Sequence, residues 1–322
     1  AVGFAESVQY ILHEELSLPS IVGGVNEVRV LAILLITALL ILALIGVGWA
    51  VKTQMILLAL LCVTIIDIIA GTFFRSGNGI TGWSGRTLRE NLGPNYDGED
   101  LFSIFAVFFP AVTGIMAGAN ISGDLKDPAV NIPLGTLSAI AVSAVVYMGL
   151  HWVAAFNIKN DTLLTEFFIF VDLAAWGPIV YAGIIAATVS SALASLIGAP
   201  RIFQSVCSDG IFPKKPFAVF AKGRGKNNEP FRGYFLSYII AVGAALIGEL
   251  NAIAPLISMF FMITYMLINM ATFIVSISDS PGWRPNFRYY NKWVSLGGAI
   301  LCVVAMFLIN WWMAILALVA GT

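Results

Sequence analysis

Charged residues are scarce in this sequence. Only 11% of its 322 residues are Asp, Glu, Lys or Arg, 59% are hydrophobic, and the formal net charge is -1. The mean hydropathy of +0.91 is too high for a soluble protein of this length. A nearly neutral chain without a basic, aromatic-rich face also excludes a nucleic-acid partner. The composition predicts an integral membrane protein, whose partner is the lipid bilayer in which it is embedded.

Cysteine, histidine and catalytic motifs are equally sparse. The three cysteines and two histidines are scattered, which excludes a disulfide scaffold and argues against a transition-metal site. The sequence lacks Gly-x-Ser-x-Gly and His-Glu-x-x-His, and the Gly-Lys of residues 225–226 is followed by Asn227 where a phosphate loop needs Ser or Thr. We therefore expect neither an enzyme nor a bound cofactor.

Apolar runs dominate what is present. At about 20 residues per crossing, we expect nine membrane helices and part of a tenth after residue 309, near residues 1–16, 30–50, 53–74, 101–121, 133–153, 177–198, 233–249, 253–277 and 294–308. We treat residues 1–322 as a single transmembrane transport domain. Because the chain starts without Met in one apolar run and stops in another, we expect a fragment.

The loops orient these helices. Twelve of the 17 Lys and Arg residues fall in one set of alternate loops. The positive-inside bias therefore predicts a cytoplasmic loop at 199–232 and an extracellular loop at 75–100. The outer loop holds six glycines and Pro94 among polar residues, a composition that suits a structured cap and a plain connector about equally.

The most informative stretch is the charge-free run that begins at residue 108. Pro110 removes a backbone donor, and Gly114 and Gly118 lower the helix propensity around it. The pattern predicts a membrane helix that is broken at mid-depth. Lipid cannot satisfy the backbone groups freed by such a break, but bound ions can.

This run resembles the sixth-helix signature of the cation–chloride cotransporters. The likeness covers residues 109–128, Ile132-Pro133 and Gly135-Thr136-Leu137, and other stretches agree in order along nearly the whole chain. The resemblance implies an all-α membrane protein with the inverted-repeat, LeuT-like fold of amino-acid permeases, truncated at both ends. By this likeness the chain begins in the third helix and ends in the twelfth.

The resemblance also implies ion ligands at the break. The Pro110 carbonyl and the Thr113 hydroxyl would face potassium, and the N–H groups of Gly114, Ile115 and Met116 would face chloride. A further likeness is Tyr265, which matches a tenth-helix tyrosine whose hydroxyl donates to the same chloride. Without the family match, Tyr265 reads more simply as an interfacial or packing residue.

A sodium site is implied at the residue pattern Ala-Thr-Val-Ser-Ser. The Ala187 carbonyl and the hydroxyls of Ser190 and Ser191 are the oxygens that sodium-coupled members use. From the residues alone, helix–helix hydrogen bonding by small polar residues is the favoured explanation of this pattern, and the resemblance reverses that preference. The acids Glu6, Asp67 and Glu249 sit in or near apolar spans and are further candidates for cation contacts.

Together these features predict a plasma-membrane symporter that couples sodium, with potassium as a further cation, to chloride. The alternative is an amino-acid or polyamine permease of the same fold, which would hold a carboxylate at Gly114. A third reading is a membrane subunit that does not transport. The family residue that helps to select potassium would lie just before Ala1, so the sequence leaves potassium transport open. A homodimer is expected from the resemblance alone.

Overall fold

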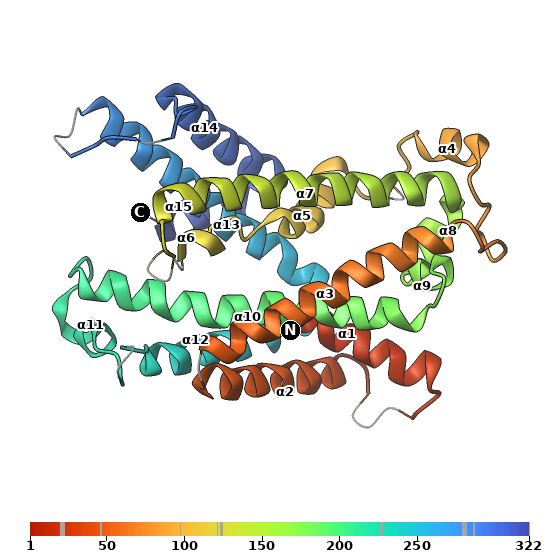
Figure 1. Ribbon diagram of the computed structural model, residues 1–322, viewed down its shortest axis with the longest axis horizontal. Helices are drawn as coiled ribbons and strands as arrows, with labels where there is room; N and C mark the ends of the chain where they lie inside the picture. The colour runs from red at the N-terminus through yellow and green to blue at the C-terminus, as the bar shows by residue number, and fades with distance from the viewer. Residues whose placement is uncertain are drawn as a thin grey trace. The chain divides into compact units, whose positions relative to one another are not determined.

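The computed structural model describes residues 1–19, 23–45, 47–96, 98–120, 122, 125–225, 228–278, 282–285 and 287–321. The chain divides into two compact units, each made of two segments. Unit 1 consists of Ala1–Pro94 and Ser138–Gly248, and unit 2 consists of Asn95–Leu137 and Glu249–Thr322. The described residues form helices and connecting turns, with three isolated β-bridges (Figure 1). This confirms the predicted all-α fold.

Unit 1 contains most of the helices. They are α1 (Val2–Tyr10), the π-helical η1 (Ile11–Glu15), α2 (Gly24–Ile45), α3 (Val47–Gly71), α4 (Gly85–Asn91), the later part of α7 (Pro128–Asn157), α8 (Asn160–Thr165), α9 (Ile169–Leu173), α10 (Pro178–Ser208), α11 (Lys214–Ala221) and α12 (Phe231–Ala245).

Helix α10 is the centre of unit 1 and packs on α1, α2, α3 and α12 (Figure 1). A core of buried apolar side chains from α2, α10 and α12 includes Leu39, Leu193 and Tyr234. Helices α3 and α10 approach closely where Thr64 donates to the Ile179 carbonyl at 3.0 Å. A Cβ at Gly183 would lie 2.5 Å from the Thr64 side chain, so only glycine fits this crossing.

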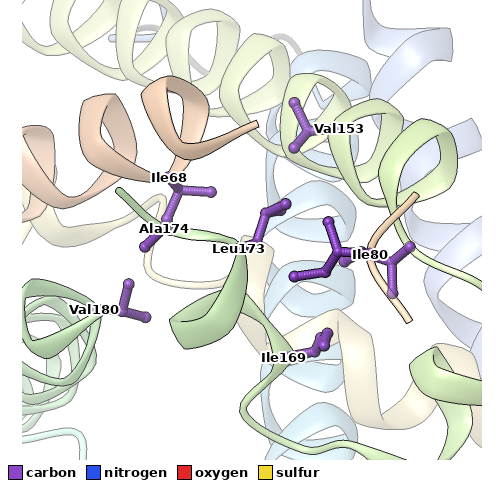
Figure 2. Close-up of a cluster of buried hydrophobic side chains, with 8 residues drawn as sticks. Ile68, Ile80, Val153, Ile169, Leu173, Ala174 and Val180 are labelled. Carbon is purple, nitrogen blue, oxygen red and sulfur yellow. The ribbon is translucent and has the colours of Figure 1, made fainter. Parts of the chain in front are cut away.

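A second apolar cluster lies where α3, α7, α9 and α10 meet. Its buried members are Ile68, Ile80, Val153, Ile158, Ile169, Leu173, Ala174 and Val180, of which Figure 2 labels all except Ile158. Side chains from two distant regions of the sequence, residues 68–80 and 153–180, thus share one core.

Residues 75–94 of the loop predicted as a cap belong to unit 1, and the rest of that loop belongs to unit 2. Ser84 caps α4 by accepting from the Thr87 N–H, and Asn91 donates to the carbonyls of Ala155 and Ile158 at the end of α7. Trp83 packs on Phe156 with ring centroids 5.3 Å apart. These contacts fix residues 83–91 against the end of α7.

Unit 2 contains α5 (Leu101–Phe108), the 3₁₀ helix η2 (Phe109–Val112), α6 (Ala117–Asn120), the start of α7, α13 (Leu250–Ile277), α14 (Lys292–Ile309) and α15 (Trp311–Gly321). Helix α13 packs on α5, α14 and α15. Its core is rich in methionine: Met259, Met262, Met266 and Met306 are at most 8% exposed. Flexible Met side chains fill irregular gaps between helices.

Within the described residues, seven helices are long and apolar enough to cross a bilayer: Gly24–Ile45, Lys52–Gly71, Leu101–Asn120, Pro128–Asn157, Pro178–Ser208, Leu250–Ile277 and Lys292–Ile309. The chain is therefore a multi-pass membrane protein, as its composition predicts. Helix α12 is shorter but apolar.

Several helix boundaries differ from the prediction. Helix α10 continues through Pro200 to Ser208, so the first part of the predicted 199–232 loop is helical. Helix α2 starts at Gly24, earlier than the predicted 30–50 span. The predicted crossing 1–16 consists of α1 and η1, which together end at Glu15.

Candidate functional site

The broken helix predicted from Pro110 and Gly114 is present in unit 2. The Asp100 carboxylate accepts from the Ser103 N–H, and the Ser103 hydroxyl accepts from the Asp100 N–H. These two bonds form a capping box at the start of α5. The α-helix tightens into the 3₁₀ turn η2, and at Thr113 the backbone becomes extended. Gly114 then adopts φ +90°, which favours glycine strongly. The chain becomes helical again in α6.

Tyr265 reaches this break from α13. The Gly114 N–H donates to the Tyr265 hydroxyl at 3.3 Å, and the Ile115 N–H also interacts with that hydroxyl. Met116 lies in the same turn, and its carbonyl accepts from the Asn120 N–H at 3.0 Å. Three of the four residues predicted for chloride thus meet around one hydroxyl. Because α6 has only four residues, the individual N–H groups that precede it matter more here than a helix dipole.

The two residues predicted for potassium lie on the other side of the same break. The Thr113 hydroxyl donates to the Pro110 carbonyl with an oxygen–oxygen distance of 2.7 Å, and the Thr113 N–H points at the same carbonyl at 3.3 Å. Both residues are partly buried. The two oxygens are close enough to contact one cation if the Thr113 hydroxyl hydrogen turns away.

Sequence reasoning missed Ser258, which also joins α13 to the broken segment. The Ser258 hydroxyl donates to the Ala106 carbonyl at 2.7 Å, and Ser258 is 0% exposed. Its partner lies 152 residues away in the chain. No local sequence signal marks this contact, because it depends on how α13 packs against α5.

The predicted sodium residues all lie on α10 in unit 1. Ala187 and Ser190 are partly buried, and Ser191 is exposed. The Thr188 hydroxyl bonds back to the carbonyls of Ile184 and Ile185, whereas within the described chain neither serine hydroxyl takes part in a hydrogen bond. The Ala187 carbonyl belongs to a continuous helix and accepts from its own helix, so it could offer only its second lone pair.

The intramembrane acids have different surroundings. The Asp67 carboxylate accepts from the Trp176 N–H at 3.0 Å, and Arg75 donates to the carbonyls of Ala174 and Ala175. These bonds attach the end of α3 to the segment that leads into α10. Glu249 is exposed just before α13. Of these acids, Asp67 is thus engaged in holding unit 1 together.

His13 has a carboxylate partner that sequence spacing did not reveal. Its Nε2 lies 2.7 Å from Oε2 of the buried Glu27, and its Nδ1 lies 2.8 Å from the Leu18 carbonyl. The hydrogen bond to Glu27 is the main cause that raises the pKa of His13 above its usual value. Both ring nitrogens face acceptors, so the protonated ring satisfies both. In the described part of the chain, no group of three or more His, Cys, Asp or Glu side chains could hold a metal ion.

A multi-pass α-helical membrane protein in which one apolar helix is broken is thus the class that this geometry defines. The sequence profile of the family "Amino acid permease" matches residues 3–322. The chain belongs to the amino acid permease family.

Curated proteins with similar sequences indicate which branch of this family the chain resembles. Mus musculus solute carrier family 12 member 2 is 44% identical over 99% of this chain and 30% of its own length. Mus musculus solute carrier family 12 member 1 is 43% identical over 99% of this chain and 33% of its own length. The Danio rerio member 2 is 42% identical over 98% of this chain and 31% of its own length. These relatives confirm the resemblance to the cation–chloride cotransporters. The chain spans about a third of their length.

Proposed function

We propose that this chain carries ion-binding segments of a plasma-membrane symporter that moves chloride together with sodium and potassium. The observation that carries the proposal is the meeting of Gly114 and Ile115 N–H groups with the Tyr265 hydroxyl at the helix break. Neutral N–H and O–H donors suit a transported anion, because they bind it without the fixed positive charge that would hinder release.

The cation assignments rest on oxygen chemistry. The Pro110 carbonyl and Thr113 hydroxyl form the proposed potassium contacts, and the Ala187 carbonyl with Ser190 and Ser191 forms the proposed sodium contacts. Freed carbonyls at a broken helix are a recurrent way to bind cations in transporters. Two unit charges about 4 Å apart attract by about 4 kcal/mol at an effective dielectric of 20. Potassium and chloride at one break would therefore stabilise each other, which couples their transport.

Two further assignments follow from the same proposal. The chain works as a transporter, without catalysis and without a cofactor other than the transported ions. The full protein assembles as a homodimer in the plasma membrane, as the family resemblance implies, and α15 begins with the stacked and exposed pair Trp311 and Trp312.

Tracer chloride uptake by the full-length protein tests this function. We expect uptake to fail when external sodium or potassium is withdrawn. Loss on sodium withdrawal alone would make the protein a sodium–chloride symporter. Uptake indifferent to both cations would contradict the proposal and favour an amino-acid permease, in which the Gly114 N–H holds a substrate carboxylate.

Tyr265→Phe tests the anion site directly. Removing a hydroxyl that donates to an anion should raise the chloride concentration for half-maximal uptake by about ten-fold. The matched control is Tyr289→Phe, because Tyr289 is 76% exposed and lies outside the site. An unchanged chloride affinity in Tyr265→Phe would remove this residue from the site.

A further inference from the structure

The broken helix leaves one buried carbonyl without its usual donor. In an α-helix the carbonyl of residue 106 accepts the N–H of residue 110. That residue is Pro110, which has no N–H. Ala106 is only 2% exposed, so water cannot easily replace the missing donor. The Ser258 hydroxyl occupies that role, with an oxygen–oxygen distance of 2.7 Å.

Ser258 and Tyr265 are seven residues apart on α13, which is two helical turns, so they share one face. Ser258 holds Ala106, before the break, and Tyr265 holds Gly114, after it. One rigid helix thus fixes both sides of the interruption. Neither bond can be replaced by the other, because each engages a different half of the broken segment.

We propose that Ser258 is a positioning residue that sets the cation side of the site. This inference rests on the proposed function, in which the Pro110 carbonyl and Thr113 hydroxyl contact potassium. Ser258 anchors the turn that ends at Pro110, whereas Tyr265 touches the N–H groups assigned to chloride. The two side chains of α13 therefore have different effects. Ser258 sets the cation affinity by placing the backbone, and Tyr265 sets the anion affinity by direct contact.

The test is Ser258→Ala in the full-length protein, with uptake measured against potassium and, at saturating potassium, against chloride. We expect the potassium concentration for half-maximal uptake to rise about ten-fold, because the buried Ala106 carbonyl loses the Ser258 donor and the turn shifts. We expect the chloride value to change by less than about three-fold. Tyr265→Phe should show the opposite pattern.

Two more variants separate positioning from simple packing. Thr264→Ala removes an exposed hydroxyl of the same helix that bonds only within α13, and should leave both affinities unchanged. In the Pro110→Ala background a backbone N–H becomes available to Ala106, so adding Ser258→Ala should have little further effect on potassium affinity. Half-saturation values do not depend on the amount of protein in the membrane, so partial loss of folding does not imitate the result.

Several outcomes would overturn the inference. One is a normal potassium affinity in Ser258→Ala, and another is an equal loss for both ions. A third is an effect of Ser258→Ala on potassium affinity that has the same size whether position 110 holds proline or alanine. That result would mean that the substitution acts by leaving a cavity, and that Ser258 does not replace the missing N–H donor. These failures leave coupled uptake by the unaltered protein intact. A failure of the proposed function shows differently, as the absence of potassium-dependent uptake in the unaltered protein, and it overturns the inference as well.

Discussion

At the scale of single residues, the site depends on a backbone N–H that proline lacks. Pro110 lacks an N–H, so the Ala106 carbonyl loses its usual helical donor, and the chain passes through η2 to the extended Thr113. Gly114 then supplies the φ of +90° that turns the backbone toward Tyr265. Two backbone groups of this segment, the Ala106 carbonyl and the Gly114 N–H, therefore pair with side chains of α13.

The serines of α10 allow a prediction at the same scale. Ser190→Ala or Ser191→Ala should raise the sodium concentration for half-maximal uptake by at least about ten-fold, since each removes a proposed oxygen ligand. Thr188→Ala is the matched control, because the Thr188 hydroxyl already bonds to Ile184 and Ile185 within its own helix. Sodium dependence should be measured by uptake at fixed chloride. If both serine variants keep the normal sodium dependence, these serines serve helix packing.

At the scale of the helices, unit 1 depends on close backbone contact. The end of α3 lies against the segment that leads from α9 to α10, where Asp67 and Arg75 bond to its backbone. A Cβ at Gly71 would come within 2.0 Å of the Leu173 carbonyl oxygen. That atom belongs to the backbone and cannot move aside as a flexible side chain can, so any side chain at this position pushes the two elements apart.

Gly71→Ala should therefore destabilise the full-length protein by about 1–3 kcal/mol or more, the usual cost of overpacking. The control is Gly149→Ala in α7, where an added Cβ meets nothing within 4 Å and alanine favours the helix by up to about 1 kcal/mol. Thermal unfolding in detergent would compare the two variants. Equal midpoints for Gly71→Ala and the unaltered protein would mean that α3 and this segment can separate at little cost.

At the scale of the whole molecule, the sequence predicts local features well and distant pairings poorly. Hydropathy locates the long apolar helices, and Pro110 with Gly114 locates the break, because each signal lies within a few residues. Pro200 misleads: it stays inside α10, fully buried, where a Cβ added at Gly233 would lie 3.0 Å from its side chain. Tertiary packing there outweighs the tendency of proline to end a helix.

The site shows the same limit. Gly114 and Tyr265 were associated only through family resemblance, since 151 residues separate them. The contact of Ser258 with Ala106 has no local signal at all, because it depends on how α13 packs against α5. The pair of His13 and Glu27 was missed for a similar reason, as it joins the end of η1 to the start of α2. Such partners become visible only when the helices are placed in space.

Coupling between ions is a property of the whole molecule, and it should appear in stability as well as in transport. A ligand that binds only the folded state at 100 times its Kd stabilises it by about 2.7 kcal/mol. The unfolding midpoint of the purified full-length protein should therefore rise more with sodium, potassium and chloride together than the separate rises would predict.

Gluconate and choline replace chloride and the cations in the reference buffers. Tyr265→Phe should lose about half of the part that depends on chloride, as a ten-fold weaker affinity requires, and keep the part that depends on sodium. Strictly additive shifts would contradict coupling, since attraction between bound cation and anion makes each bind better when the other is present.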